Sequence, residues 1–225
     1  MSDTVHGVHH HNDDEDADVI IRPIDSTEAT AVGELLVNAY VVGGHLSAES
    51  AYTRELSDVG SRLEYTWVAE VDGEIVGTIC LCPPDGASPA ALCRGNANEY
   101  EFRFLAISPD AWGGGVGQAL VAECEAQAVT SGAERMVISV VDLNVRGLNF
   151  YALQGYSRMP ERDWSPVVAP NPNPERPAET VPVLILALTK KLPVLHSTLP
   201  THLENFSDNP RRCLRLRAPH PTVTK

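Results

Sequence analysis

The residues with the clearest chemical meaning form a glycine-rich stretch in the middle of the chain. Four glycines fall within the five positions Gly113–Gly117, after the apolar segment 104–107 and before a helical pattern of apolar residues. Glycine lets a backbone approach a ligand closely, and the first N–H groups of a helix point outward without partners. A strand, a glycine loop and a helix in this order predict a site for a phosphate or pyrophosphate.

This loop lacks the residues that two common nucleotide-binding motifs require. A Walker A loop needs a Gly-Lys-Ser/Thr sequence, and no lysine lies near the glycines. The dinucleotide fingerprint needs a third glycine, but Gln118 and Leu120 stand in that register from Gly113 and Gly115. We therefore expect neither nucleotide hydrolysis nor hydride transfer.

The glycine loop resembles the cofactor-binding loop of the GNAT superfamily of acyl-CoA-dependent N-acetyltransferases. The family's signature is a strand, a Gln/Arg-x-x-Gly-x-Gly/Ala loop and a helix, and residues 112–117 read Trp-Gly-Gly-Gly-Val-Gly. Trp112 departs from the family's Gln or Arg. Because such a loop works mainly through its backbone N–H groups, we expect this departure to weaken CoA binding without abolishing it.

A second motif supports the same resemblance, which spans about residues 19–192. The family's Asn-x-x-Ala-x-x-x-Tyr motif is matched by residues 144–151, with Gly147 in place of Ala. The Gly-Phe pair that follows it is matched by Gly155 and Tyr156. Two motifs at the right separation are specific for fold and cofactor, but they say little about the acceptor.

The resemblance implies a GNAT-like fold of the mixed α/β class, with a mostly antiparallel central sheet splayed at the cofactor cleft and helices on both faces. It implies acetyl-CoA as co-substrate and no metal.

The resemblance also implies which residues bind the cofactor. The backbone of residues 105–107 would pair with the pantetheine arm like an added strand, and the N–H of Ile107 would polarise the thioester carbonyl. The cofactor-binding residues expected on this basis are Leu105, Ala106, Ile107, Gly113, Gly114, Gly115, Val116, Gly117, Gln118 and Asn144.

Tyr151 takes the family position of the general acid that meets the departing sulfur. A free thiol has a pKa of about 8.5 and tyrosine about 10, so full proton transfer is uphill by roughly 2 kcal/mol. We therefore expect Tyr151 to donate a hydrogen bond to the thiolate without fully losing its proton. The alternative is a packing role as a core aromatic residue beside Phe150.

Glu101 is the candidate base that would take a proton from the amine. In the histone-acetyltransferase branch of the family, a glutamate in this register acts as base. The alternative is a surface ion pair of Arg103 with Glu101 or with Glu99. His45 and His196 are weaker candidates for the base. Strict strand alternation places Glu101 on one face with Glu99, Arg103, Leu105 and Ile107.

These residues need elements that hold them in place, and hydrophobic periodicity with turn residues predicts those elements. Strands are expected at 19–22, 65–71, 74–81, 99–107, 136–141, 156–158 and 183–190. Helices are expected from a cap at 25–28 to Gly43, roughly over 47–62, from the glycine loop to Ser131, and over 144–154. This order predicts a mixed α/β layer fold with one core.

Length, composition and charge exclude several classes of protein. The 225 residues are 43% hydrophobic and 21% charged, which suffices for a packed core. The net charge of -13 disfavours sequence-independent binding to nucleic acid. The longest apolar run, 181–188, is too short to span a bilayer, and no secretory signal is visible. We expect a cytoplasmic protein without nucleic-acid or membrane partners.

Composition divides the chain into three parts. Residues 1–18 read as an acidic, histidine-containing disordered tail, 19–192 as the N-acetyltransferase domain, and 193–225 as a proline-containing basic tail. We expect the domain to move an acetyl group from acetyl-CoA to the amine of a small molecule or peptide, by direct attack in a ternary complex. Transfer of a longer acyl group, a non-catalytic acyl-CoA sensor, an interaction protein acting through the basic tail, and a homodimer stay open.

Overall fold

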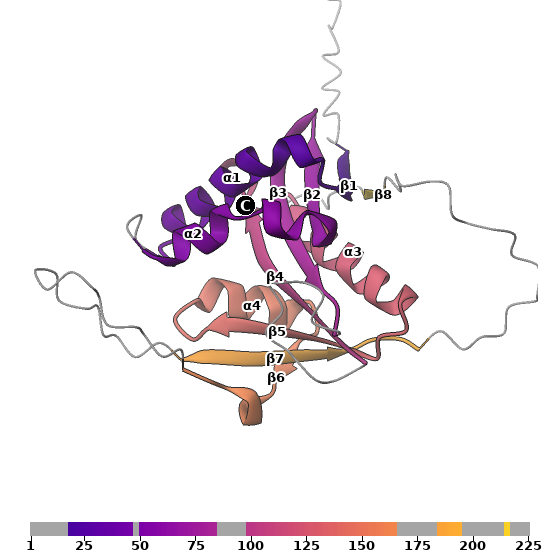
Figure 1. Cartoon of the computed structure of the whole chain (residues 1–225). Coiled ribbons are helices and arrows are strands. Elements are labelled where there is room, and N and C mark those ends of the chain that lie inside the picture. Colours follow the sequence, from indigo (N-terminus) through magenta and orange to yellow (C-terminus); the bar gives the residue numbers. More distant parts are fainter. Residues whose placement is uncertain (1–17, 47–49, 85–97, 166–183, 195–213, 217–225) are drawn as a thin grey trace, which may run out of the picture.

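The computed structural model describes residues 18–46, 50–84, 98–165 and 184–194, together with the backbone of 214–216 (Figure 1). The strands in this part of the chain are β1 Val19–Pro23, β2 Thr66–Val71, β3 Glu74–Cys82, β4 Glu99–Ile107, β5 Arg135–Val141, β6 Ser157–Arg158, β7 Ile185–Lys191 and β8 Leu214–Leu216. The α-helices are α1 Ala29–Val42, α2 Tyr52–Ser57, α3 Val116–Thr130 and α4 Val145–Leu153. Short 3-10 turns are η1 Ser26–Glu28, η2 Gly60–Tyr65, η3 Pro109–Ala111 and η4 Pro160–Arg162.

The strands form one sheet in the order β6-β7-β5-β4-β3-β2-β1-β8. The pairing of β4 with β5 is parallel, whereas the other neighbouring strands are antiparallel. The parallel pairing runs only from Glu99–Arg135 to Glu101–Val137, after which the two strands separate (Figure 1). We call this unpaired region, residues 102–107 of β4 and 138–141 of β5, the splay. The predicted fold class, a mostly antiparallel splayed sheet with helices on both faces, is confirmed.

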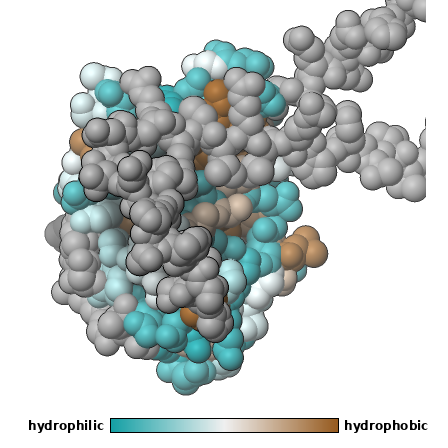
Figure 2. Space-filling model, turned by 90° about the vertical axis from the view of Figure 1, so that its right-hand side faces the viewer, coloured by the Kyte–Doolittle hydropathy of each residue, from teal (hydrophilic) through white to brown (hydrophobic). Residues whose placement is uncertain are grey.

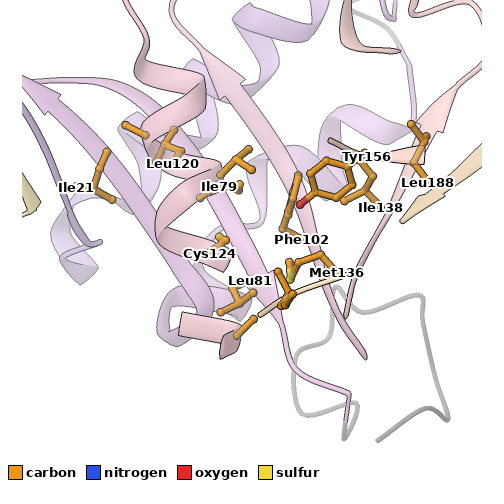
Figure 3. Packing of buried hydrophobic residues seen from close by; sticks show 14 of the residues in the cluster. Ile21, Ile79, Leu81, Phe102, Leu120, Cys124, Met136, Ile138, Tyr156 and Leu188 are labelled. Carbon is orange, nitrogen blue, oxygen red and sulfur yellow. The ribbon is translucent and has the colours of Figure 1, made fainter. Parts of the chain in front are cut away.

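Each face of the sheet has its own hydrophobic cluster. On one face, α3 and α4 pack against the sheet, and Figure 3 shows Leu120 and Cys124 of α3 over Ile79 and Leu81 of β3. On the other face, α1 and α2 cover the sheet through Leu36 and Leu56 among others. The approach of α3 depends on Gly77, because a Cβ there would lie 3.0 Å from the Val116 side chain and 3.1 Å from that of Leu120.

A β-bulge in β4 changes which side chains share a face. The pairing of β3 with β4 shifts register between Thr78 and Cys80, and Phe104 opposite this shift has a φ of 56°. Before the bulge, Phe102 packs in the α3 cluster; after it, Leu105 and Ile107 pack there too, while Phe104 and Ala106 lie in the α1–α2 cluster. The extra residue of a bulge breaks the period of two. The strict alternation predicted for this strand is therefore wrong beyond Arg103.

The predicted helix over 47–62 is also wrong in its extent. Residues 47–49 lie outside the described residues, α2 ends at Ser57, and η2 follows. The buried guanidinium of Arg62 explains the break, because it donates to the backbone carbonyls of Glu55, Leu56 and Asp58 at the end of α2. A side chain that satisfies these carbonyls replaces the bonds of a further helical turn.

The sheet extends beyond the domain boundary predicted at residue 192. β8 pairs with the edge strand β1, from Val19–Leu216 to Ile21–Leu214. This strand lies in the segment interpreted as a tail.

The described surface in Figure 2 is mainly hydrophilic, and no helix among the described residues is long and apolar enough to cross a membrane.

Candidate active site

The glycine loop forms an open cradle at the start of α3. Gly113 and Gly115 have φ values of 88° and 79°, a region that favours glycine. The first N–H groups of a helix have no intrahelical acceptor, and within the described residues no side chain caps those of α3. A Cβ built at Gly113 would meet no atom within 4 Å. Open space, uncapped N–H groups and left-handed glycines fit the pyrophosphate predicted from the sequence.

Gly117 brings α4 against the first turn of α3. A Cβ at this position would lie 3.4 Å from the Phe150 ring of α4 and 3.8 Å from the Ile107 side chain of β4. An alanine would make ordinary contacts here, whereas a branched side chain would push the elements apart. The loop, the end of β4 and α4 therefore meet at Gly117.

The backbone at the end of β4 faces the splay. Ser108 donates to the carbonyl of Val76 at 2.7 Å, so the neighbouring pair Gly77–Ile107 is of the non-hydrogen-bonded kind. The N–H and C=O of Ile107 consequently point away from β3, toward the side from which β5 has separated. The N–H of Ile107, the donor that the family resemblance implies, is therefore not used in the ladder with β3.

Trp112, which stands where the family prefers Gln or Arg, ties the loop to this strand. Its indole Nε1–H donates to the carbonyl of Ile107 at 2.9 Å. The guanidinium of Arg146, in the first turn of α4, lies 4.1 Å from the centroid of the Trp112 ring. The side chain of Trp112 thus links β4, the loop and α4.

The start of α4 is fixed by Asn144. Its Oδ1 accepts a hydrogen bond from the N–H of Gly147 at 2.8 Å, which makes it the N-cap. A Cβ at position 147 would lie 2.6 Å from Nδ2 of Asn144. Glycine in place of the family's alanine therefore gives the cap its room, and the cap positions Tyr151 two turns later.

Tyr151 is half-buried among aromatic rings. Its ring centroid lies 5.1 Å from that of Phe150 and 5.9 Å from those of Phe102 and Tyr156. Burial raises the pKa of Tyr151 above its usual value, so the hydroxyl stays protonated at neutral pH. A protonated phenol can donate a hydrogen bond but cannot act as a base.

Tyr156, which replaces the family's phenylalanine, adds hydrogen bonding next to Tyr151. Its hydroxyl donates to Oε1 of Glu125 on α3 at 2.9 Å, and Nζ of Lys190 on β7 donates to the same carboxylate at 2.7 and 2.8 Å. The turn after α4 is thereby joined to both α3 and β7.

Glu101 lies on the opposite face of the sheet. It is only 1% exposed, and it pairs across the ladder with Cys82, whose side chain belongs to the α1–α2 cluster. The surface position assumed in its alternative role is therefore wrong, but the charge of Glu101 still acts on that of Arg103. Glu99 is 7% exposed and bonds instead to Arg162 at 2.6 Å. Glu101 does not share a wall with Leu105 and Ile107.

Around Arg103, next to Glu101 on this face, is an aromatic cluster that no sequence motif marks. Arg103 lies 3.1 Å from the Glu55 carboxylate, donates to the hydroxyl of Tyr52 at 3.3 Å, and stacks over Phe104. The ring of Tyr40 lies 6.4 Å from that of Tyr52. Burial raises the pKa of Tyr40, and the nearby hydroxyls of Tyr52 and Tyr151 add to this shift.

The weaker candidates for the base differ in how they are placed. His45 is exposed, and its ring lies 6.1 Å from that of Tyr40. Partial burial and the charge of Arg146 lower its pKa, so its imidazole is neutral at neutral pH. His196 lies outside the described residues. Among those residues, no group of three or more His, Cys, Asp or Glu side chains is placed to hold a metal ion.

Comparison with known proteins decides the family. The model of the acetyltransferase (GNAT) family matches residues 31–156, more than half of the chain. This protein belongs to the GNAT family. It is therefore an acyltransferase that depends on acyl-CoA, as the glycine loop and the Asn144 motif indicated. No curated protein matches the sequence.

Solved GNAT structures share the fold at low sequence identity. Ribosomal-protein-alanine N-acetyltransferase from Brucella melitensis is 19% identical with a TM-score of 0.55, and the match covers 76% of this chain and 99% of that one. The yncA protein of Salmonella typhimurium, solved with its cofactor acetyl-CoA, is 16% identical with a TM-score of 0.55, covering 82% and 99%. The paia N-acetyltransferase from Thermoplasma acidophilum, in complex with coenzyme A, is 16% identical with a TM-score of 0.56, covering 77% and 98%.

Proposed function

We propose that this GNAT protein moves an acetyl group from acetyl-CoA to the amine of a small molecule or peptide, by direct attack in a ternary complex. The observation that carries the proposal is a set of three features on the elements that border the splay. These are the uncapped glycine loop, the outward N–H of Ile107 and the protonated hydroxyl of Tyr151. Acetyl-CoA would supply the acetyl group already activated as a thioester.

The cofactor would be held mainly by backbone. The N–H groups from Gly113 to Gln118 would bind the pyrophosphate, and the edge of residues 105–107 would bind the pantetheine arm as a strand binds its neighbour. The N–H of Ile107 would donate to the thioester carbonyl, where negative charge develops during attack. Asn144 would contribute by fixing the start of α4, since its side-chain oxygen already serves as the cap.

Tyr151 would stabilise the departing thiolate. Its pKa is raised by burial, which makes full transfer of its proton even less favourable than the roughly 2 kcal/mol expected for ordinary groups. It would therefore act as a hydrogen-bond donor to sulfur, which needs no net transfer. The thiolate can take its proton from solvent after it leaves.

Glu101 would serve the amine from the other face of the sheet. Because it lies on the α1–α2 face, we propose that the acceptor enters along Tyr40 and Tyr52 and that its proton reaches Glu101 through water. A base matters most for a strongly basic acceptor. Deprotonation at pH 7 costs about 4.6 kcal/mol for a lysine-like amine, whereas it costs only about 1–1.5 kcal/mol for an α-amine.

Release of free thiol from acetyl-CoA tests the proposal. Purified protein would be mixed with acetyl-CoA and, in turn, with amino acids, polyamines, amine-bearing antibiotics and peptides with a free N-terminus. We expect thiol release that requires one class of amine, and propionyl-CoA and butyryl-CoA would then define the acyl length. Binding of acetyl-CoA without release for any amine would instead indicate an acyl-CoA sensor.

A further inference from the structure

Arg146 lies beside the glycine loop, and its charge is not paired with a carboxylate among the described residues. Five other described arginines form ion pairs with carboxylates: Arg22, Arg103, Arg135, Arg158 and Arg162. No ion pair within the described part of the chain involves Arg146, and its side chain is exposed. The contact that orients it is the Trp112 ring, 4.1 Å from its guanidinium carbon.

Trp112 is itself held by a hydrogen bond, which gives Arg146 a positioned support. The indole N–H donates to the carbonyl of Ile107 at 2.9 Å, so the ring cannot rotate away without losing this bond. Trp112 directly precedes Gly113, where the backbone turns through a positive φ and the space beside it is open. A guanidinium that stacks on an aromatic face keeps its N–H groups directed outward in its own plane.

From this geometry we propose that Arg146 binds the pyrophosphate of CoA and that Trp112 is the shelf that positions it. The proposal rests on the proposed function, since it assumes that the loop binds CoA. In the motif of the sequence, the position of Trp112 is the one at which the family prefers Gln or Arg. Arg146 on α4 would thus supply the cation that the loop lacks. Trp112 would support this phosphate ligand instead of being one itself.

Affinity for CoA and its fragments tests this assignment by titration calorimetry without any turnover. We expect Arg146→Ala to weaken CoA and dephospho-CoA about ten- to a hundredfold, the range for one charge-assisted bond to phosphate. Affinity for pantetheine, which has no phosphate, should stay unchanged. The matched control is Arg54→Ala, which removes the same charge from an exposed helical position and should leave all three affinities unchanged.

Two further variants separate the shelf from the charge. Trp112→Ala should weaken CoA nearly as much as Arg146→Ala, and combining the two should add little, because both disrupt one contact. Trp112→Arg in the Arg146→Ala background should recover part of the affinity. The wild-type affinity for CoA should also fall more steeply with added salt than that of Arg146→Ala.

The outcomes distinguish the inference from the proposed function. A wild-type protein that fails to bind CoA overturns both. Binding of CoA by Arg146→Ala with wild-type affinity overturns the role of Arg146 and leaves the proposed function standing. An equal loss for pantetheine would show that Arg146 only positions α4, and a loss for CoA but not for dephospho-CoA would move its contact to the 3′-phosphate; either result overturns the assignment.

Discussion

The cofactor side of the proposed site is made mainly of backbone, whereas the acceptor side is made of side chains. Residues 105–118 supply a strand edge, a turn and a helix start within one continuous stretch. The α1–α2 face gathers Tyr40, Tyr52, Glu101 and Arg103 from three elements. Backbone groups are common to all residues, so the loop keeps its N–H donors with Trp112 in place of the family's Gln or Arg, and the proposed Trp112–Arg146 pair is the side-chain part of this side. The second side depends on each side chain and can be altered one residue at a time.

The largest effect should come from filling the cradle on the cofactor side. Gly115→Val places a branched residue at a φ of 79°, and Gly117→Leu pushes on Phe150, so either change should remove CoA binding. We expect the rise in melting temperature that CoA causes in the wild type to disappear. Differential scanning fluorimetry at millimolar CoA measures this shift.

A matched glycine elsewhere provides the control. Gly60 has no atom within 4 Å of a built Cβ and an ordinary backbone conformation, so Gly60→Ala should keep the full response to CoA. A cradle variant that still shows the wild-type shift would contradict the backbone character of this side.

The next effect concerns Tyr151, the proposed donor to the leaving sulfur. Tyr151→Phe keeps the ring and its packing but removes the donor to the leaving sulfur, so turnover should fall about ten- to a thousandfold. CoA affinity should stay unchanged, and steady-state kinetics with equilibrium titration separates the two quantities.

Tyr156→Phe is the control for the loss of a neighbouring hydroxyl. It breaks the bond to Glu125, which should cost about 1 kcal/mol of stability without a change in turnover. Equal turnover of Tyr151→Phe and wild type with an authentic acceptor would show that Tyr151 has only a packing role.

The contrast between the two sides also explains what the sequence could predict. The glycine loop and the Asn144–Tyr151 motif are local patterns, and the fold, the family and the loop followed from them. The bulge at Phe104 has no such pattern, since nothing in a run of apolar residues marks one phenylalanine for a positive φ. Its ring makes cation–π contacts with Arg62 and Arg103, and Arg62 becomes its neighbour only in the folded chain.

Short elements escaped prediction for a related reason. β8 has three residues, too few for a period to stand out, and it exists because β1 offers an unpaired edge. The end of α2 depends on Arg62, which reaches back from η2 to its last carbonyls. The β8 pairing is a long-range contact that no sequence window contains. The Arg62 contacts span only four to seven residues, but they follow no helical or strand period, so a periodicity analysis does not reveal them.

A smaller effect is expected from Glu101, on the acceptor side. Glu101→Gln should lower turnover about ten- to a hundredfold at pH 7 for an amine of pKa near 10, because the acceptor must then lose its proton unaided. The deficit should shrink as pH rises toward the pKa of the amine. Glu99→Gln, which instead breaks the bond to Arg162, should lose stability but keep the wild-type pH profile. Identical profiles for Glu101→Gln and wild type would remove Glu101 from the mechanism.

The smallest effect should follow from removing β8, which lies at the far edge of the sheet from the splay. Deletion of 193–225 exposes the edge of β1 and loses a few ladder bonds, each worth about 0.5–1.5 kcal/mol net. Deletion of 217–225 keeps β8 and serves as the control. We expect the longer deletion to lower the melting temperature by several degrees relative to the shorter one, at roughly 2–4 °C per kcal/mol for a chain of this size. CoA affinity should be the same in both, since β1 and β8 are separated from the cofactor edge of β4 by β2 and β3. A loss of CoA affinity in the longer deletion alone would mean that the far edge of the sheet supports the cofactor side. The cofactor side would then extend beyond residues 105–118.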